Sequence, residues 1–218
     1  MELLKLFNVT KTFETGEKCT PVDRVNLTIC ENDFISIMGV SGSGKSTLLM
    51  LMGGLLKPTS GDLSYCGESL YSMSDDALAK WRGKNVGYLF QNVQMVQALT
   101  LRENIELARR YGNNPKADIE ELLEKLELTK LQNSLPSQMS GGQRRRALFA
   151  VTMVRDPKLI LADEPTNDLD SHWSQKIVDL LEDAAQKGKA VVLVTHNSKW
   201  AGRADKRYMM ENSTLNII

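Results

Sequence analysis

No apolar run in this chain of 218 residues is long enough to cross a membrane. The longest runs cover residues 47–56 and 147–154, whereas a membrane-spanning helix needs roughly 18 to 20 apolar residues. The first residues alternate like a strand and lack the basic and apolar regions of a signal peptide. The sequence therefore predicts a protein that stays in the cytoplasm.

The sequence also lacks a net charge, because 27 lysines and arginines balance 27 aspartates and glutamates. This balance gives no support for a general nucleic-acid binder or membrane-surface binder. Cysteine is scarce: Cys19, Cys30 and Cys66 show no metal-ligand spacing, and an odd number cannot all pair. We therefore expect buried free thiols rather than a metal site or a redox site.

Strand-like apolar runs alternate with helical patterns through much of the chain. A strand-like run precedes a helical pattern in three places: Phe34–Met38 before Lys45–Met52, Leu159–Asp163 before 171–185, and 190–195 before a short helix. Such alternation predicts an α/β fold with a mostly parallel sheet covered by helices. Segments 3–8 and 25–29 are more amphipathic and predict strands of an antiparallel β subdomain.

The middle of the chain has a different pattern. Between about 92 and 139 the apolar residues follow a helical period with almost no strand signal, as in Ile119, Leu122, Leu123, Leu126 and Leu128. We expect a single domain over 1–218. In it, 1–91 and about 140–218 form the core, and about 92–139 form an inserted α-helical subdomain.

Residues 39–47, Gly-Val-Ser-Gly-Ser-Gly-Lys-Ser-Thr, have the pattern of a phosphate-binding P-loop. The segment follows a strand-like run and opens a helical one, as this motif requires. Its glycines let backbone N–H groups point at phosphate oxygens, and the helix adds its positive N-terminal end. Lys45 is expected to reach the β- and γ-phosphates, and the Ser46 hydroxyl to bind Mg²⁺. The predicted nucleotide contacts are Gly39, Ser41, Gly42, Ser43, Gly44, Lys45, Ser46 and Thr47.

Two adjacent carboxylates, Asp163 and Glu164, stand at the end of the apolar run 159–163. Side chains of a buried parallel strand reach a ligand crevice only at its carboxyl end. Asp163 is therefore expected to support Mg²⁺, directly or through water, and Glu164 to polarise the water that attacks the γ-phosphate. Alone, an acidic strand end is often a helix cap, but together with the P-loop it predicts a nucleoside triphosphatase.

Residues 139–143, Met-Ser-Gly-Gly-Gln, lie just before a helical pattern. They resemble the signature sequence of ABC ATPases, which usually reads Leu-Ser-Gly-Gly-Gln. A serine here suits a helix cap, and the two glycines expose backbone N–H groups to a second anion. The resemblance implies a head-to-tail dimer that sandwiches two ATP molecules. In it, the P-loop ATP of one subunit is covered by the partner's signature, whose contacts are Ser140, Gly141, Gly142 and Gln143.

Other positions of the ABC pattern follow in order along the chain. Gln91 matches the glutamine that senses Mg²⁺ and links to the helical subdomain, which implies a catalytic and metal-binding role. His196 matches the switch histidine that contacts the γ-phosphate. Residues 167–170 match the D-loop that crosses to the other subunit, so Asp168 is implied in the nucleotide site. Phe13 stands where the family places an aromatic ring against adenine, although a lone Phe is more often part of a core.

The chain departs from the ABC pattern in two places. After the signature glutamine it reads Arg-Arg-Arg, where the family usually has x-Gln-Arg. We expect Arg144 and Arg145 to be solvated or to make contacts within the subunit rather than to bind nucleotide. In the D-loop, Asn167 and Asp168 stand where relatives often have Gly and Asn, which puts a carboxylate near the dimer seam.

Residues 100–105 and 162–166 look most similar to the ABC group that serves macrolide export, lipoprotein release and bacterial cell-division signalling. The resemblance implies an ATP-hydrolysing transporter subunit that uses ATP and Mg²⁺ and is peripheral on the cytoplasmic face of the cell membrane. Its implied partners are a second copy of itself or a homologous cassette, and a separate transmembrane permease, with no nucleic acid. Met95 and Val96 are candidates for docking the permease, or they pack inside the helical subdomain.

Two other classes of function stay open at this point. A soluble ABC ATPase would have a role outside transport, for example in iron–sulfur assembly or cell-division signalling. A P-loop enzyme outside the family, such as a small-molecule kinase, would have no use for residues 139–143 or for His196.

Overall fold

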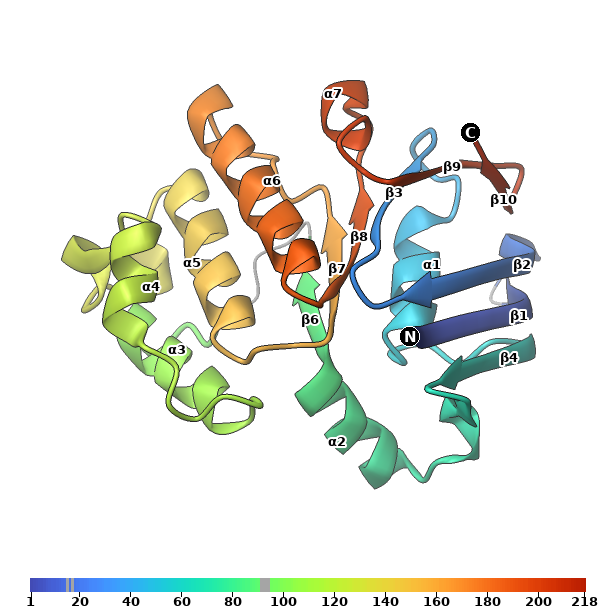
Figure 1. Cartoon of the computed structure of the whole chain (residues 1–218), viewed down its shortest axis with the longest axis horizontal. Helices are drawn as coiled ribbons and strands as arrows, with labels where there is room; N and C mark the ends of the chain where they lie inside the picture. The colour runs from blue at the N-terminus through green and yellow to red at the C-terminus, as the bar shows by residue number, and fades with distance from the viewer. Residues whose placement is uncertain (15, 17, 91–94) are drawn as a thin grey trace.

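The computed structural model describes residues 1–14, 16, 18–90 and 95–218, and its strands form two sheets (Figure 1). The larger sheet, in the order β10-β9-β3-β8-β7-β6, contains β3 (Phe34–Met38), β6 (Val86–Leu89), β7 (Leu159–Asp163), β8 (Ala190–Val194), β9 (Lys206–Glu211) and β10 (Thr214–Ile217). The smaller sheet, in the order β2-β1-β4-β5, contains β1 (Glu2–Phe13), β2 (Cys19–Cys30), β4 (Ser60–Tyr65) and β5 (Glu68–Ser69).

Helices of the described residues cover the larger sheet and extend beyond it. They are α1 (Lys45–Met52), α2 (Asp75–Asn85), α3 (Leu101–Arg110), α4 (Ile119–Lys125), α5 (Gly141–Met153), α6 (Ser171–Gln186) and α7 (Ser198–Ala201). Short 3₁₀ turns lie at Leu70–Ser72, Thr129–Leu131 and Pro136–Gln138. In Figure 1 the strands β1, β2 and β4 lie at one end of the molecule, and α3 and α4 lie at the other.

The larger sheet is built on parallel pairs. Strand β3 pairs in parallel with β8 and β9, and β7 pairs in parallel with β6 and β8. Every residue of β7 and β8 is buried, which is why these strands read as continuous apolar runs. The structure confirms the predicted α/β fold, and the bounds of β3, α1 and β7 agree with the prediction.

The smaller sheet is antiparallel, as segments 3–8 and 25–29 predicted, but its first two strands are longer. The pairing register of β1 and β2 shifts between Leu6 and Val9 and again toward the hairpin. Such bulges interrupt the alternation of buried and exposed residues, so only the regular parts of these strands show in the sequence.

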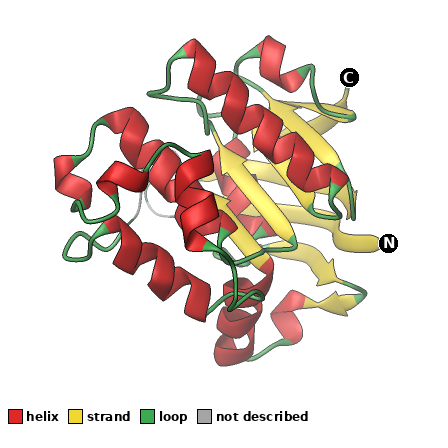
Figure 2. Ribbon diagram, turned by 60° about the vertical axis from the view of Figure 1, so that its left-hand side comes forward, coloured by secondary structure: helices red, strands yellow, loops and turns green. Residues whose placement is uncertain are grey.

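The central strands divide the interior into two apolar clusters, because successive side chains of a strand point to opposite faces. Ile35 and Ile37 of β3 belong to a cluster that includes Leu48 of α1 and residues of the smaller sheet. Phe34 of β3 and Val191 of β8 belong to the cluster that includes residues of α3 to α6. Figure 2 shows these helices gathered beside the strands.

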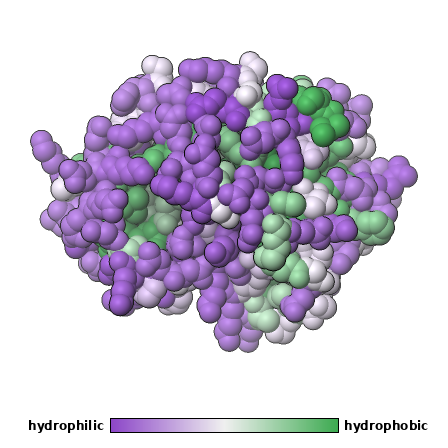
Figure 3. All heavy atoms as spheres, in the orientation of Figure 1, coloured by the Kyte–Doolittle hydropathy of each residue, from purple (hydrophilic) through white to green (hydrophobic). Residues whose placement is uncertain are grey.

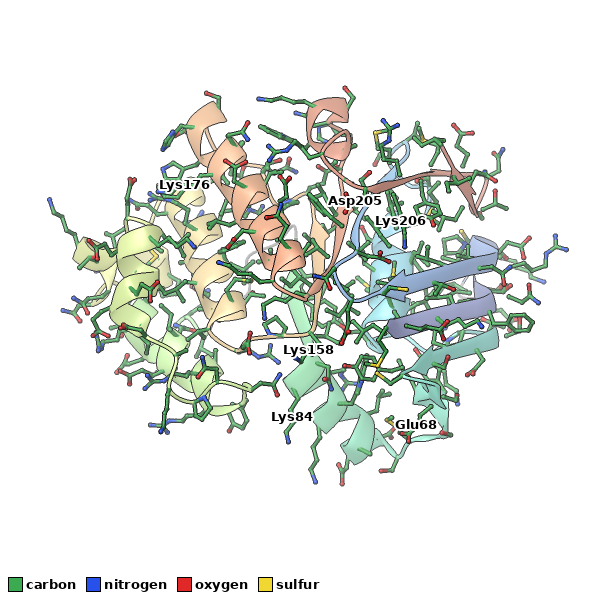
Figure 4. All side chains as sticks on the ribbon, viewed as in Figure 1. Glu68, Lys84, Lys158, Lys176, Asp205 and Lys206 are labelled. Atoms are coloured by element: carbon green, nitrogen blue, oxygen red, sulfur yellow. The ribbon has the colours of Figure 1, made fainter. Side chains whose placement is uncertain are left out.

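Between residues 95 and 140 the structure contains helices α3 and α4 and two 3₁₀ turns, in keeping with the helical pattern. Met95, Leu101 and Leu123 pack in the same cluster as α5 and α6. From α6, Lys176 places its Nζ atom 3.3 Å from Glu127 Oε1, just beyond α4 (Figure 4). The division of the chain into a core and a helical subdomain at about 92–139 stays a prediction.

The surface is mainly polar, and the face in Figure 3 is largely hydrophilic with separate apolar patches. Among the described residues, no helix combines the length and the apolar character that crossing a membrane requires. The prediction of buried thiols was wrong for Cys19 and Cys66, which are exposed; Cys30 is partly exposed. Cys19 opens β2, and Cys66 lies in the turn between β4 and β5 with a φ angle of 49°. Such strand ends and turns face solvent.

The segment before α3 is held by one buried side chain. Asn104 is 4% exposed, and its Oδ1 atom accepts a hydrogen bond from the Val96 N–H at 2.9 Å. Its Nδ2 atom donates to the carbonyl oxygens of Val96, Leu99 and Thr100 at 3.1, 3.0 and 2.9 Å. The conformation of 96–100 therefore depends on a residue inside the following helix.

We expect Asn104→Ala to lower the free energy of unfolding by about 2 kcal/mol, because backbone groups lose their partners. Urea unfolding followed by circular dichroism measures this change. Glu106→Gln on the same helix is the control. It weakens a partly exposed ion pair with Arg102 and should change the free energy by less than about 0.5 kcal/mol. Equal effects of the two variants would contradict the role of Asn104.

Candidate functional site

A cavity of about 510 Å³ opens at the carboxyl ends of β3, β7 and β8. Parallel pairing aligns these ends, so the residues that follow the strands meet at one edge of the sheet. The lining residues are Pro21, Gly39, Val40, Ser41, Gly42, Gly44, Lys45, Ser46, Thr47, Asp163, Glu164, Asn167 and His196. Most of the site residues that the sequence predicted are thus brought together.

The P-loop leads directly into α1, and the first residues of this helix line the cavity. Gly44 precedes the helix with a φ angle of 103°, and a Cβ atom there would lie 1.9 Å from the carbonyl oxygen of Pro21. Only glycine fits this position. The first N–H groups of a helix have no partner within the helix. Because Lys45, Ser46 and Thr47 line the cavity, these groups lie where an anion would bind.

Lys45 is held by the loop that carries it. Its Nζ atom donates to the carbonyl oxygens of Gly39 at 2.8 Å and Val40 at 2.7 Å, and lies 3.3 Å from Ser43 Oγ. Burial lowers the pKa of the Lys45 ammonium, and the charges of Glu164 and Asp163 oppose this shift. The ammonium group of Lys45 therefore lines the cavity together with the carboxylates of Asp163 and Glu164.

Ser46 and Asp163 both line the cavity and contact each other directly. The Ser46 hydroxyl donates to Asp163 Oδ2 at 2.6 Å. Burial raises the pKa of the Asp163 carboxyl, while this hydrogen bond and the charge of Lys45 act in the opposite direction. A hydroxyl and a carboxylate oxygen are the kind of ligands that Mg²⁺ takes, usually together with waters and phosphate oxygens.

Glu164 is fixed in place by the last residue of β8 and by the residues that follow it. Its N–H donates to the carbonyl of Val194 at 2.9 Å, and its φ angle is 47°. Its carboxylate accepts hydrogen bonds from the His196 N–H at 2.9 Å and the Thr195 hydroxyl at 3.2 Å. The Nδ1 atom of His196 lies 2.8 Å from Glu164 Oε1. A carboxylate with one orientation therefore faces the P-loop.

Thr195 is a site residue that the sequence analysis missed. Its side chain is completely buried, and the hydroxyl that donates to Glu164 also accepts a hydrogen bond from the Asn197 N–H at 3.1 Å. In the sequence it appears only as the last residue of the predicted strand 190–195. A hydroxyl at the strand end was the available signal, but its partner lies 31 residues earlier in the chain.

The signature residues do not line the cavity of their own chain. Ser140 precedes α5 and accepts a hydrogen bond from the Gln143 N–H at 3.3 Å, as its predicted capping role requires. Gln143 Oε1 accepts in return from the Ser140 N–H at 2.8 Å. The signature therefore forms a second helix N-terminus at a separate place on the surface.

The remaining predictions fall on different parts of the structure. Phe13 is 38% exposed at the end of β1 and is not a core residue. Met95 is 9% exposed and packs in the helical cluster, which is the second of its two alternatives; Val96 is 47% exposed. Gln91 lies outside the described residues.

The two arginines after the signature make contacts within the subunit, which is one of the two expectations. Arg144 Nη1 donates to the carbonyl of Met139 at 2.6 Å. Arg145 is 3% exposed and donates to the carbonyl of Phe90 at 2.6 Å.

Comparison with known proteins gives a family and close relatives. The ABC transporter family model matches residues 22–167. The chain is 36% identical over 217 residues to the macrolide export ATP-binding/permease protein MacB of Chlorobaculum tepidum, covering 98% of this chain and 33% of MacB. It is 36% identical over 221 residues to the lipoprotein-releasing system ATP-binding protein LolD of Shewanella oneidensis, covering 99% of this chain and 96% of LolD. The chain thus spans a third of MacB and nearly all of LolD.

Among solved structures, the fold is similar to a dimeric post-hydrolysis state of the ATP-binding cassette MJ0796 of Methanocaldococcus jannaschii, bound to ADP and Pi. The TM-score is 0.90 at 37% identity, over 98% of this chain and 96% of that one. The family match covers more than half of the chain and includes the P-loop, Asp163 and Glu164. The chain therefore belongs to the ABC transporter family and has the fold of its ATP-binding cassettes.

Proposed function

We propose that this chain is the ATP-hydrolysing subunit of an ABC transporter, and that ATP joins it to a second cassette and drives a separate membrane permease. The observation that carries the proposal is the placement of Glu164. Its carboxylate is held by Thr195 and His196 beside the P-loop, in a cavity that is also lined by the cation Lys45. This arrangement suits the attack of water on a terminal phosphate.

The triphosphate would bind along the P-loop, where backbone N–H groups and the start of α1 favour negative charge. Lys45 would exchange its contacts with the loop carbonyls for the β- and γ-phosphate oxygens. Ser46 and Asp163 would hold Mg²⁺, which would supply neutralisation of the phosphate charge. The ring of Phe13, exposed at the end of β1, would pack against adenine.

Glu164 would accept the proton of the attacking water on its carboxylate. The short contact with His196 Nδ1 leaves the other ring nitrogen of that residue for a γ-phosphate oxygen. Gln91, which lies outside the described residues, would contact Mg²⁺ as the family resemblance implies. These roles divide the work: the P-loop positions the phosphates, and the ends of β7 and β8 direct the water.

A second cassette would complete the site. The signature residues Ser140, Gly141, Gly142 and Gln143 lie away from the cavity of their own chain, so they suit a nucleotide held by a partner. Two positively polarised helix ends would face each other without a nucleotide, and the triphosphate would supply the attraction between them. The partner is a second copy of the chain or a homologous cassette.

The transport role is supported by the relatives. LolD is named as the ATP-binding protein of a lipoprotein-releasing system, and MacB as an ATP-binding and permease protein. We infer that this chain lies on the cytoplasmic face of a membrane. The helical subdomain at about 92–139 would contact the permease and transmit movement to it. The second candidate, an ABC ATPase in iron–sulfur assembly, has no comparable support among these relatives.

Glu164→Gln is expected to keep ATP affinity and to lower the turnover number by at least about 10²-fold, because the amide does not accept the proton of water. The variant should also accumulate as an ATP-bound dimer, since the nucleotide persists between the subunits. A phosphate-release assay and light scattering measure the two effects. Near-normal hydrolysis by the Glu164→Gln variant would contradict the role of Glu164 as the proton acceptor.

Adding Ser140→Arg to the Glu164→Gln variant is the control for the dimer. The arginine would place a bulky cation in the partner's phosphate site. The double variant should bind ATP with an intact fold yet remain monomeric in light scattering. A dimer that forms regardless of ATP would show that another interface dominates.

Thr195→Val should reduce the turnover number by roughly 10-fold with little change in KM, because Glu164 loses one hydrogen bond to its charged carboxylate. Thr195→Ser keeps the hydroxyl and should retain wild-type turnover. Steady-state ATPase assays of both variants, with thermal unfolding as a check on stability, measure the difference. Equal turnover numbers of the two variants would contradict a role of the Thr195 hydroxyl in hydrolysis.

The membrane partner is tested by recovering the tagged chain from detergent-solubilised membranes. We expect an integral membrane protein to co-purify in amounts comparable with the chain and to stimulate its ATPase. Recovery of the chain only with soluble proteins would favour the role outside transport, while leaving the ATPase assignment in place.

A further inference from the structure

A second pocket, of about 120 Å³, opens between helices α4, α5 and α6. In Figure 1 these three helices lie side by side, with α5 in the middle. The pocket shares no lining residue with the cavity that contains the P-loop. It is therefore a separate place at which a ligand could bind.

The floor of this pocket is apolar. It is formed by Leu122, Leu126, Phe149, Met153, Leu180 and Ala184. Leu126, Phe149 and Ala184 are buried, and the other three are partly buried and pack against the same core. On that side of the molecule Figure 3 shows apolar atoms within a hydrophilic surround. Because an apolar cavity of about 150 Å³ can hold benzene, the floor has room for an apolar group of about six carbons.

The rim of the pocket carries more positive than negative charge. Three lysines, Lys125, Lys187 and Lys189, line it together with one carboxylate, Asp183. Lys187 is paired with Asp183 at 2.8 Å. Lys189 forms an ion pair with Asp156 and donates to the carbonyl of the next residue at 3.2 Å. Two of the three ammonium groups therefore already have a carboxylate partner.

Lys125 is the cation of the rim that stays available. It is the last residue of α4 and is exposed, and within the described part of the chain it has no hydrogen-bond or ion-pair partner. Glu121, one turn earlier, lines the neighbouring hollow together with Lys125, yet the two form no ion pair. A lysine in the last turn also suits the negative end of a helix. A test of this residue must therefore measure ligand binding rather than stability.

We propose that this pocket binds a small apolar carboxylate, with a chain or ring of about six carbons and one negative charge. The apolar part would lie on Leu126, Phe149 and Ala184, and the carboxylate would accept a hydrogen bond from Lys125 Nζ. A neutral apolar molecule would leave the ammonium group without a partner, and a small ion such as acetate would gain nothing from the floor. The inference goes beyond the proposed function and does not depend on it.

The test is a titration of the full chain with hexanoate, followed through the NMR signal of the Met153 methyl group. The signal is assigned by its loss in Met153→Leu. Hexanoate should shift it along a saturable curve with a dissociation constant on the order of 1 mM, because a ligand of about eight non-hydrogen atoms gains limited free energy. Hexan-1-ol should bind about 5-fold more weakly, the upper value for an exposed charge pair. Acetate should give no saturable shift.

Lys125→Gln keeps most of the side chain and removes its charge. This variant should bind hexanoate as weakly as it binds hexan-1-ol, while its affinity for hexan-1-ol equals that of the wild type. Lys130→Gln is the matched control. Lys130 is an exposed lysine of the turn Thr129–Leu131 and does not line the pocket. The control should bind both compounds like the wild type.

Ala184→Val tests the apolar part of the site. The valine would add two methyl groups to the floor, so hexanoate and hexan-1-ol should lose affinity by the same factor. Thermal unfolding shows whether the variant keeps its fold, since added volume in a packed region can destabilise it. If Ala184→Val does not fold, the comparison of hexanoate with acetate tests the apolar part by itself.

Four results would overturn the proposal. The first is a hexanoate shift that is absent or does not saturate. The second is equal affinity of the wild type for hexanoate and hexan-1-ol, or wild-type binding of hexanoate by Lys125→Gln. In the third, the Met153 signal moves with protein concentration alone, which would mean that a second copy covers the pocket. In the fourth, a peptide with one leucine between two aspartates saturates the pocket and hexanoate does not, which would assign it to a protein partner.

The titration requires no ATP hydrolysis. Its failure would leave the proposed ATPase untouched, and a chain without ATPase activity could still bind hexanoate. The two conclusions are therefore tested separately.

Discussion

The parallel pairing of β3, β8 and β7 is the constraint on which the site depends. Ile37 pairs with Val194, and Val194 pairs with Asp163, so the three strands end at the same level. The P-loop, the carboxylate of Glu164 and the side chain of His196 all follow these ends and line one cavity. An antiparallel arrangement would send at least one of these segments to the opposite edge of the sheet.

Charge within the cavity is arranged before any phosphate enters it. Burial disfavours the charged forms of Lys45 and Asp163, while neighbouring opposite charges and the Ser46 hydrogen bond counteract it. Fixed groups of this kind need little rearrangement during a reaction, which is the main electrostatic advantage of an enzyme site. The left-handed backbone of Glu164 is one cost of that arrangement.

The P-loop and the signature lie at separate places in the chain. The cavity collects the P-loop and the carboxylate of Glu164, whereas the signature begins a helix elsewhere. This division is in keeping with the similarity to a dimeric cassette. Contacts of Arg145 with Asn167 and Asp168 connect helix α5 to the loop that follows Glu164.

The sequence by itself determined the P-loop, the two carboxylates at the end of β7, the signature and the α/β fold, because each is encoded in neighbouring residues or in a regular period. Tertiary structure alone decided the hydrogen bond from Thr195 to Glu164, the burial of Met95 and the contact of Arg145 with Asp168. It also placed β4, β9 and β10, which are short and partly exposed. These features depend on partners that are distant in the chain, and local patterns carry no record of which distant residue a side chain will meet.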